Sequence, residues 1–213
     1  MPGIGNADYE NWQTFTLGLN ADKYITEELM PMIYNWFPAS EKREDNFIAG
    51  LSMGGKGTLM FALKYPQLFS KAAVLSFIPS DMENQKEKFE KLYSLTLDEV
   101  ISDSDVMHQN QRLYNCMHNM GSVEAYMNSY YNLRRKLKEA DLSKLPELLF
   151  ACGTEDSIFA GEIASFKQFL KEINLEVKWT MGPGNHEWRV WERDIQIALD
   201  FFSKENTGKG NAF

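Results

Sequence analysis

Cysteine, histidine and proline are scarce in this chain of 213 residues. It has two cysteines, three histidines and seven prolines. Two cysteines cannot build a disulfide framework, and no spacing of Cys and His typical of a metal cluster occurs. Cys152 closes a short apolar run, so we expect a buried free thiol there.

The sequence also lacks long apolar runs and an excess of positive charge. No run reaches 18 apolar residues, and no charged-then-apolar leader opens the chain. The formal net charge is −8 at pH 7. This sign argues against nucleic acid and anionic membrane as partners. We therefore expect a soluble, cytoplasmic protein.

Four short apolar runs alternate with helical patterns. The alternation is typical of a parallel sheet with right-handed crossovers, and the length suits one α/β domain over residues 1–213. The expected strands are residues 46–49, 72–77, 148–152 and 175–181. The expected helices are residues 24–36, 55–64, 158–173 and 190–202, the first kinked at Pro31. Residues 207–213, rich in Gly and Asn, are expected to be disordered.

Residues 79–145 interrupt this alternation of expected strands and helices. The segment is polar, rich in Met, Tyr and Asn, and has helical patterns near residues 84–93, 96–101 and 122–140. It is expected to be a helical insertion, either an extended crossover packed on the sheet or a cap that shapes a pocket. His108 and His118 lie in it and are interpreted as surface residues.

Ser52 stands in the pattern Gly50-Leu-Ser-Met-Gly54, between an apolar strand and a helix. This is the context of a nucleophile elbow, a tight turn that needs small residues on both sides of the serine. A chain of this length contains the pattern by chance roughly 0.06 times. We therefore interpret Ser52 as a nucleophile at the carboxyl end of the sheet.

A serine needs a base, usually a histidine held by a carboxylate. His186 lies in a Gly/Pro loop after the last expected strand, and Asp156 lies in the loop after the preceding strand. The chain order serine, acid, histidine is that of α/β hydrolases. Asp156 could also cap the helix that follows it. Glu155 and then Asp194 are the alternative acids.

Ser52, Asp156 and His186 together indicate acyl transfer through a covalent acyl-enzyme. The backbone N–H of Met53 is the expected first donor of the oxyanion hole. This chemistry needs neither a metal nor an organic cofactor. Trp188 and Trp12 are candidates for contacts with substrate, with core packing as the alternative interpretation.

Three segments carry a resemblance: Ile48-Ala-Gly-Leu-Ser-Met-Gly-Gly, Cys152-Gly-Thr-Glu-Asp and Gly184-Asn-His-Glu-Trp. They resemble the elbow, acid loop and histidine loop of the esterase D-like family of α/β hydrolases, most closely the bacterial tributyrin, acetyl and feruloyl esterases. S-formylglutathione hydrolases belong to the same group. The resemblance implies an α/β-hydrolase fold and the triad Ser52, Asp156 and His186.

The sequence departs from that family at its start. Family members carry further strands ahead of the position matching Met1, and a loop that supplies a second oxyanion donor. The resemblance therefore implies a shortened fold in which strand 46–49 has an unpaired edge. It also implies weak activity and a homo-oligomer that covers this edge.

Three functions fit the sequence. The first is a serine carboxylic ester hydrolase acting on small molecules, either short acyl or carbohydrate-linked acetyl and feruloyl esters. The second is an acyltransferase with the same triad. The third is an inactive or weakly active truncated esterase domain.

Overall fold

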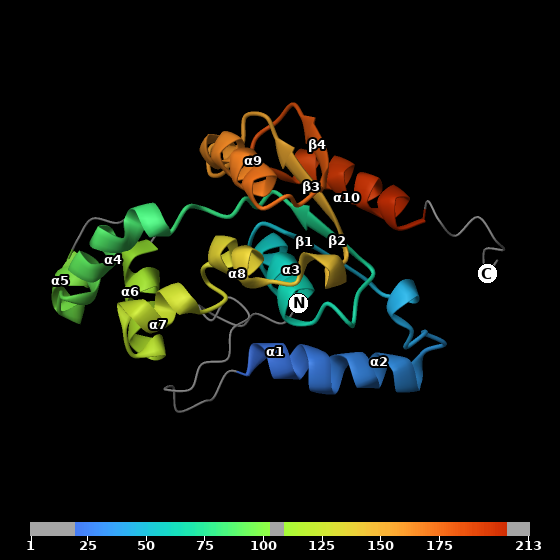
Figure 1. Ribbon diagram of the computed structural model, residues 1–213, viewed down its shortest axis with the longest axis horizontal. Coiled ribbons are helices and arrows are strands. Elements are labelled where there is room, and N and C mark those ends of the chain that lie inside the picture. Colours follow the sequence, from blue (N-terminus) through green and yellow to red (C-terminus); the bar gives the residue numbers. More distant parts are fainter. Residues whose placement is uncertain (1–19, 103–108, 204–213) are drawn as a thin grey trace. The chain divides into compact units, whose positions relative to one another are not determined.

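A four-stranded parallel sheet lies at the centre of the chain's largest folded part (Figure 1). The computed structural model describes residues 20–102 and 109–203. The strands are β1 (Phe47–Leu51), β2 (Lys71–Leu75), β3 (Glu147–Gly153) and β4 (Lys178–Gly182). Their order across the sheet is β1-β2-β3-β4. The four predicted strands and their parallel arrangement are confirmed, although β4 begins three residues later than predicted.

Strand β1 is an edge strand among the strands that the structure describes. It pairs with β2 in register from Phe47 opposite Lys71 to Leu51 opposite Leu75. Its residues are all partly exposed, whereas those of β2 are all buried. This agrees with the expected edge at residues 46–49, because a strand with one neighbour leaves half its backbone groups outside the sheet.

Helices cover both faces of the sheet. Ala73 and Leu75 of β2 pack with Ala198 and Phe201 of α10 (Trp188–Ser203) in one buried cluster. Neighbouring residues in a strand point to opposite faces. Phe150 of β3 accordingly points to the other face, where its ring packs edge-to-face against Phe166 of α9 (Ile163–Glu172).

The helix after the elbow, α3, runs from Met53 to Lys64 and is almost wholly buried. It connects β1 to the neighbouring parallel strand β2, a crossover that is right-handed in nearly all proteins. Three short 3₁₀ turns complete this part: η3 (Arg43–Asp45), η5 (Leu142–Lys144) and η6 (Ala160–Glu162). The helix predicted from residue 158 therefore begins as η6, and its α-helical part starts at Ile163.

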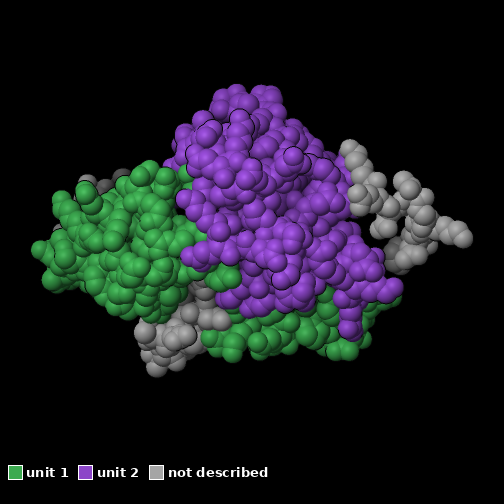
Figure 2. All heavy atoms as spheres, viewed as in Figure 1, with its two compact units in different colours: residues 1–39, 81–136 green, residues 40–80, 137–213 purple. Residues whose placement is uncertain are grey.

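The described residues fall into two compact units (Figure 2). Unit 2 holds those of residues 40–80 and 137–213, which include the whole sheet. Unit 1 holds those of residues 1–39 and 81–136. A single domain over 1–213, with 79–145 as an insertion, stays a prediction. Residues 207–213 lie outside the described part.

One continuous helical segment opens unit 1: α1 (Ala21–Lys23), η2 (Tyr24–Leu29) and α2 (Met30–Trp36). The element η2 is a π-helix, and the Met30 N–H bonds to the Ile25 carbonyl. Pro31 follows directly, and a proline lacks the N–H and clashes with the carbonyl four residues before it. The disturbance predicted at Pro31 thus takes the form of a π turn.

The rest of unit 1 is helical. It contains η4 (Glu83–Gln85), α4 (Lys86–Tyr93), α5 (Leu97–Ser102), α6 (Gln109–Met120) and α7 (Val123–Asn128), with α8 (Leu133–Glu139) crossing into unit 2. The prediction of one helix over residues 122–140 is wrong, because Ser129 caps α7 in an extended conformation. Helix α6 was not predicted.

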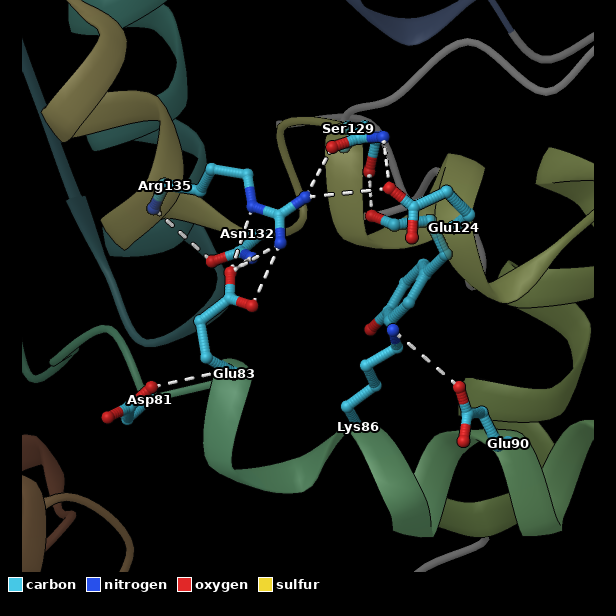
Figure 3. Close-up of polar contacts among 10 residues, drawn as sticks. Asp81, Glu83, Lys86, Glu90, Glu124, Ser129, Asn132 and Arg135 are labelled. Atoms are coloured by element: carbon cyan, nitrogen blue, oxygen red, sulfur yellow. Dashed lines mark hydrogen bonds and ion pairs between the residues drawn. The ribbon is translucent and has the colours of Figure 1, made fainter.

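Arg135 ties the start of α8 to η4 within unit 1 (Figure 3). Its Nε and Nη2 donate to the two carboxylate oxygens of Glu83 at 2.9 and 2.8 Å. Asn132 donates to the same carboxylate at 2.9 Å. Two parallel bonds between a guanidinium and a carboxylate fix geometry more strictly than one. The network therefore sets how α8 meets η4.

Candidate active site

Ser52 occupies a strained turn between β1 and α3. Its φ is +53° and its ψ −117°, a conformation that L-residues rarely adopt. The Ser52 N–H donates to the Leu75 carbonyl of the neighbouring strand at 2.9 Å. The turn is thus held to the end of β2, and it presents the hydroxyl at the carboxyl edge of the sheet.

The two glycines around Ser52 are not equivalent. A Cβ at Gly50 would lie 2.3 Å from the Gly54 carbonyl oxygen. A Cβ at Gly54 would meet no atom within 4 Å outside its own helical backbone and chain neighbours. The prediction that both positions must be small is therefore correct for Gly50 and wrong for Gly54.

Asp156 is fully buried in the turn after β3. Its Oδ1 accepts the backbone N–H groups of Ile158 and Phe159 at 3.0 and 3.2 Å. Its Oδ2 faces His186 Nδ1 at 2.9 Å and accepts the Cys152 thiol at 3.6 Å. The carboxylate therefore caps the turn and also faces the histidine, the two roles weighed from the sequence.

His186 lies in the loop after β4 and connects the two other residues. Its Nδ1 is 2.9 Å from Asp156 Oδ2, and its Nε2 is 2.9 Å from Ser52 Oγ. A carboxylate only accepts hydrogen bonds, so Nδ1 carries the proton that is donated to Asp156. In the neutral imidazole Nε2 is then the acceptor for the Ser52 hydroxyl.

Glu155 and Asn185 join the acid loop to the histidine loop. Glu155 accepts the Gly184 N–H through its side chain and donates its own N–H to the Gly184 carbonyl at 3.1 Å. Asn185 Oδ1 accepts the N–H groups of Ser157 and His186 at 2.9 and 2.8 Å. Glu155, the first alternative acid, thus acts on the backbone of the loop and not on the imidazole.

Asp194, the other alternative acid, lies on α10 and is fully buried. Its Oδ1 accepts the Arg193 Nε at 2.8 Å. Burial raises the pKa of the Asp194 carboxyl, although the hydrogen bond and the charge of Arg193 lower it. It makes no hydrogen bond to His186 among the described residues.

Cys152 is a buried free thiol, as predicted. Burial, and next the negative charge of Asp156, raise the pKa of its thiol to about 12. The thiol therefore keeps its proton at neutral pH and remains a donor to Asp156 Oδ2.

The other histidines and the two candidate tryptophans do not join this group. His118 lies in α6 of unit 1, where it stacks on Tyr93 and Tyr114 at 4.2 and 3.9 Å between ring centroids. His108 and Trp12 lie outside the described residues. Trp188 is 70% exposed at the start of α10.

One residue that was not predicted as part of the site contacts His186, and a second contacts the site only through the first. The Trp191 ring stands edge-to-face against the His186 ring, with centroids 5.1 Å apart. Its indole N–H donates to the Ser76 hydroxyl at 3.0 Å. Trp191 could have been suspected from its place one helical turn after Trp188. Ser76 carries no recognisable motif.

Met53 is the first residue of α3 and follows Ser52 directly. The first N–H groups of a helix have no carbonyl acceptor within the helix. The positive end of the helix dipole adds to the attraction for negative charge at this point. The Met53 N–H is therefore available to an oxyanion formed beside Ser52.

The described residues contain no group of three or more His, Cys, Asp or Glu side chains that could hold a metal ion. A hollow of about 440 Å³ lies at the other end of the sheet, where Phe47, Lys71 and Glu147 begin their strands. It contains none of the triad residues. No helix in the described ranges is both long and apolar enough to cross a membrane.

Residues 5–202 match the family described as "Putative esterase". The chain belongs to this esterase family. The predicted resemblance to esterases is therefore confirmed, and the architecture is that of the α/β hydrolases.

Relatives of this esterase-family chain include an acetyl esterase from Caldicellulosiruptor saccharolyticus. It is 26% identical over 191 residues, which are 85% of this chain and 63% of that protein. The chain thus spans less than two thirds of that relative's length.

Two solved Staphylococcus aureus structures are also similar. An S-formylglutathione hydrolase has 26% identity and a TM-score of 0.65, over 93% of this chain and 68% of that one. A fluorophosphonate-binding serine hydrolase has 26% identity and a TM-score of 0.57, over 92% and 68%.

Proposed function

We propose that this chain is a serine carboxylic ester hydrolase that works through an acyl-enzyme on Ser52. The observation that carries the proposal is the continuous hydrogen-bonded series from Asp156 through His186 to Ser52, with both contacts at 2.9 Å. Membership of the esterase family supports the same reaction class.

His186 is the proposed general base. Its Nε2 takes the proton from the Ser52 hydroxyl as the oxygen attacks the ester carbonyl, and it then gives this proton to the leaving alcohol. Asp156 holds the imidazole through Nδ1 and stabilises the imidazolium that forms. Water, deprotonated by His186, releases the acid and restores Ser52.

Met53 is the proposed oxyanion donor. Its backbone N–H follows the nucleophile directly and stands at the N-terminus of α3, so it can bond to the negative oxygen of the tetrahedral intermediate. This assignment names one donor. Removing one such donor typically costs about 100- to 1000-fold in turnover, so the supply of a second donor governs how active the chain is.

The substrates that we propose are small-molecule esters with short acyl groups or carbohydrate-linked acetyl or feruloyl groups. The acetyl esterase relative supports an acetyl group. Trp188, exposed at the start of the helix that follows His186, is the proposed contact for the alcohol or aryl part. Transfer of the acyl group to an alcohol instead of water would require the same three residues.

A p-nitrophenyl acetate assay tests the proposal on the chain and on three variants. Ser52→Ala, His186→Ala and Asp156→Asn are each expected to lower kcat by about 10⁴-fold or more, leaving only the residual rate that the oxyanion donor and substrate binding support. An added alcohol that diverts the acyl group would identify a transferase. A Ser52→Ala variant as active as the parent would overturn the proposal.

We also propose that the edge of β1 pairs with another copy of the chain, because the strand has one neighbour among the described strands. Sedimentation velocity over a hundredfold range of concentration tests this. A dimer that dissociates on dilution is expected. A monomer at every concentration would contradict it.

A further inference from the structure

Ser76 has two unusual properties for a serine with no assigned role. It is completely buried, and its φ is +44°, in the left-handed region that L-residues rarely occupy. It directly follows Leu75, whose carbonyl accepts the Ser52 N–H. Strained residues persist where the surrounding structure over-determines them, and they concentrate at functional sites.

Backbone contacts hold Ser76 in place. Its N–H donates to the Ala151 carbonyl on β3 at 2.7 Å. The strained Ser76 therefore lies at the carboxyl edge of the sheet, at the end of β2. The neighbouring strands are β1, which precedes Ser52, and β3, which precedes Asp156. From this place the hydroxyl accepts the indole N–H of Trp191 at 3.0 Å.

Trp191 in turn stands against the base. Its ring is 5.1 Å from the His186 ring between centroids, with an angle of 85° between the planes. Phe159 also lies near the imidazole, with 5.7 Å between the ring centroids and 51° between the ring planes. The hydrogen bonds of His186 restrain the imidazole only while they are made. The ring contacts with Trp191 and Phe159 restrain its rotation also when a hydrogen bond is broken.

We propose that Ser76 and Trp191 position His186: the buried Ser76 hydroxyl fixes the indole of Trp191, and the indole holds the imidazole in the orientation that reaches Ser52 and Asp156 together. The inference rests on the proposed function, because it assigns His186 as the base. It makes Ser76 and Trp191 positioning residues, since neither contacts the reacting atoms.

Three single variants test the inference. Ser76→Ala removes the hydroxyl and keeps the backbone strain, whereas Ser76→Gly removes the hydroxyl and relieves the strain. Trp191→Phe keeps an aromatic wall and removes the indole N–H. Trp36→Phe, at a 73% exposed position on α2, is the matched control for the tryptophan change.

The expected result is the same loss in all three variants. The kcat for p-nitrophenyl acetate falls about 10-fold, because a misplaced base costs rate rather than binding, and KM stays within about twofold. Ser76→Gly loses activity without losing stability, which a purely structural role would not produce. The double variant Ser76→Ala/Trp191→Phe is no worse than either single one, since both remove the same hydrogen bond.

A second readout does not depend on turnover. In the parent chain the His186 Nδ1 proton bonds to a buried carboxylate, so its NMR signal should exchange slowly with water. In the three variants exchange should be about 10-fold faster, and in Trp36→Phe unchanged. A parent chain without turnover would overturn the proposed function alone, and the NMR signal would still decide this inference. Unchanged kcat and unchanged exchange in the Ser76 variants would overturn the inference.

Discussion

Gly50 and Gly54 flank Ser52 symmetrically in the sequence and differ in space. Gly50→Ala should destabilise the chain by about 1–3 kcal/mol, because its Cβ would overlap the Gly54 carbonyl and the elbow would have to shift. Gly54→Ala is the matched control. It lies in the first turn of α3 with open space, and should be neutral or stabilise by up to about 1 kcal/mol. Urea unfolding measures both, and equal effects would contradict the asymmetry.

Cys152 gives a second prediction at the scale of single residues. With a thiol pKa of about 12, its thiolate fraction at pH 8 is about 10⁻⁴, and the thiol is also buried. Iodoacetamide should therefore leave Cys152 unmodified in the folded chain. In urea both cysteines should react, which serves as the control.

Peptide mass mapping after the two treatments reads the result. Modification of Cys152 within minutes under native conditions would show that the thiol beneath Asp156 is accessible, contrary to its burial.

The residues of the candidate site differ in how readable they are from sequence. Ser52 and His186 stand in local motifs, and their order with Asp156 along the chain follows from the order of the strands. Ser76 and Trp191 meet across 115 residues through a single hydrogen bond. Such a contact depends on the register between β2 and α10, which no local pattern encodes.

At the scale of elements, the contact between η4 and α8 depends on the ion pair of Glu83 with Arg135. Arg135→Lys would keep the charge and lose the bidentate bond to Glu83. We expect a loss of about 1 kcal/mol, no more, because the arginine side chain is 25% exposed and water screens the pair. Thermal unfolding measures the loss.

Lys86→Arg is the control for this change, since it alters the exposed pair of Lys86 with Glu90 on the same unit. It should leave the free energy of unfolding unchanged. An equal loss in both variants would mean that the bidentate geometry contributes nothing.

The strands were easier to predict than the helices of unit 1. Each strand is a short apolar run whose type follows from length and composition. Helix α6 was missed because its sequence is largely polar and its buried residues are few: Cys116, Met117 and Asn119. The break between α7 and α8 was missed because Ser129 ends α7 through local backbone bonding of its side chain to Tyr126, which overrides helix propensity.

At the scale of the whole molecule, stability should depend on the buried carboxyl of Asp194. Its pKa is raised in the folded chain, chiefly by burial, so the folded chain holds this proton at pH values where the unfolded chain has lost it. The free energy of unfolding therefore falls as pH rises above about 4, through the folded pKa of Asp194.

Asp194→Asn removes this dependence. The stability of the variant relative to the parent should grow as pH rises from about 4, in urea unfolding at a series of pH values. Asp200→Asn, exposed on the same helix, controls for the loss of one negative charge. A difference between Asp194→Asn and the parent that does not change with pH would contradict the burial argument.

The composition of the whole chain limited the classes of protein to which it could belong. The alternation of apolar runs with helical patterns predicted the parallel sheet. Residues 79–145 were predicted to form a helical insertion, and residues 81–136 of it fall in unit 1. The grouping of this segment with residues 1–39 was not predicted, because no sequence pattern links the two. The units are defined by contacts between residues far apart in the sequence. Such contacts depend on side-chain packing, which the polar, aromatic-rich sequence of residues 79–145 does not predict.

The central claim is that Ser52 is a nucleophile activated by His186. A fluorophosphonate probe measures this directly, because it phosphonylates an activated serine without requiring turnover. We predict one adduct per chain, located on Ser52 by peptide mass mapping, absent in Ser52→Ala and slowed at least about 100-fold in His186→Ala. A folded chain whose Ser52 stays unlabelled, or is labelled equally fast without His186, would contradict the account.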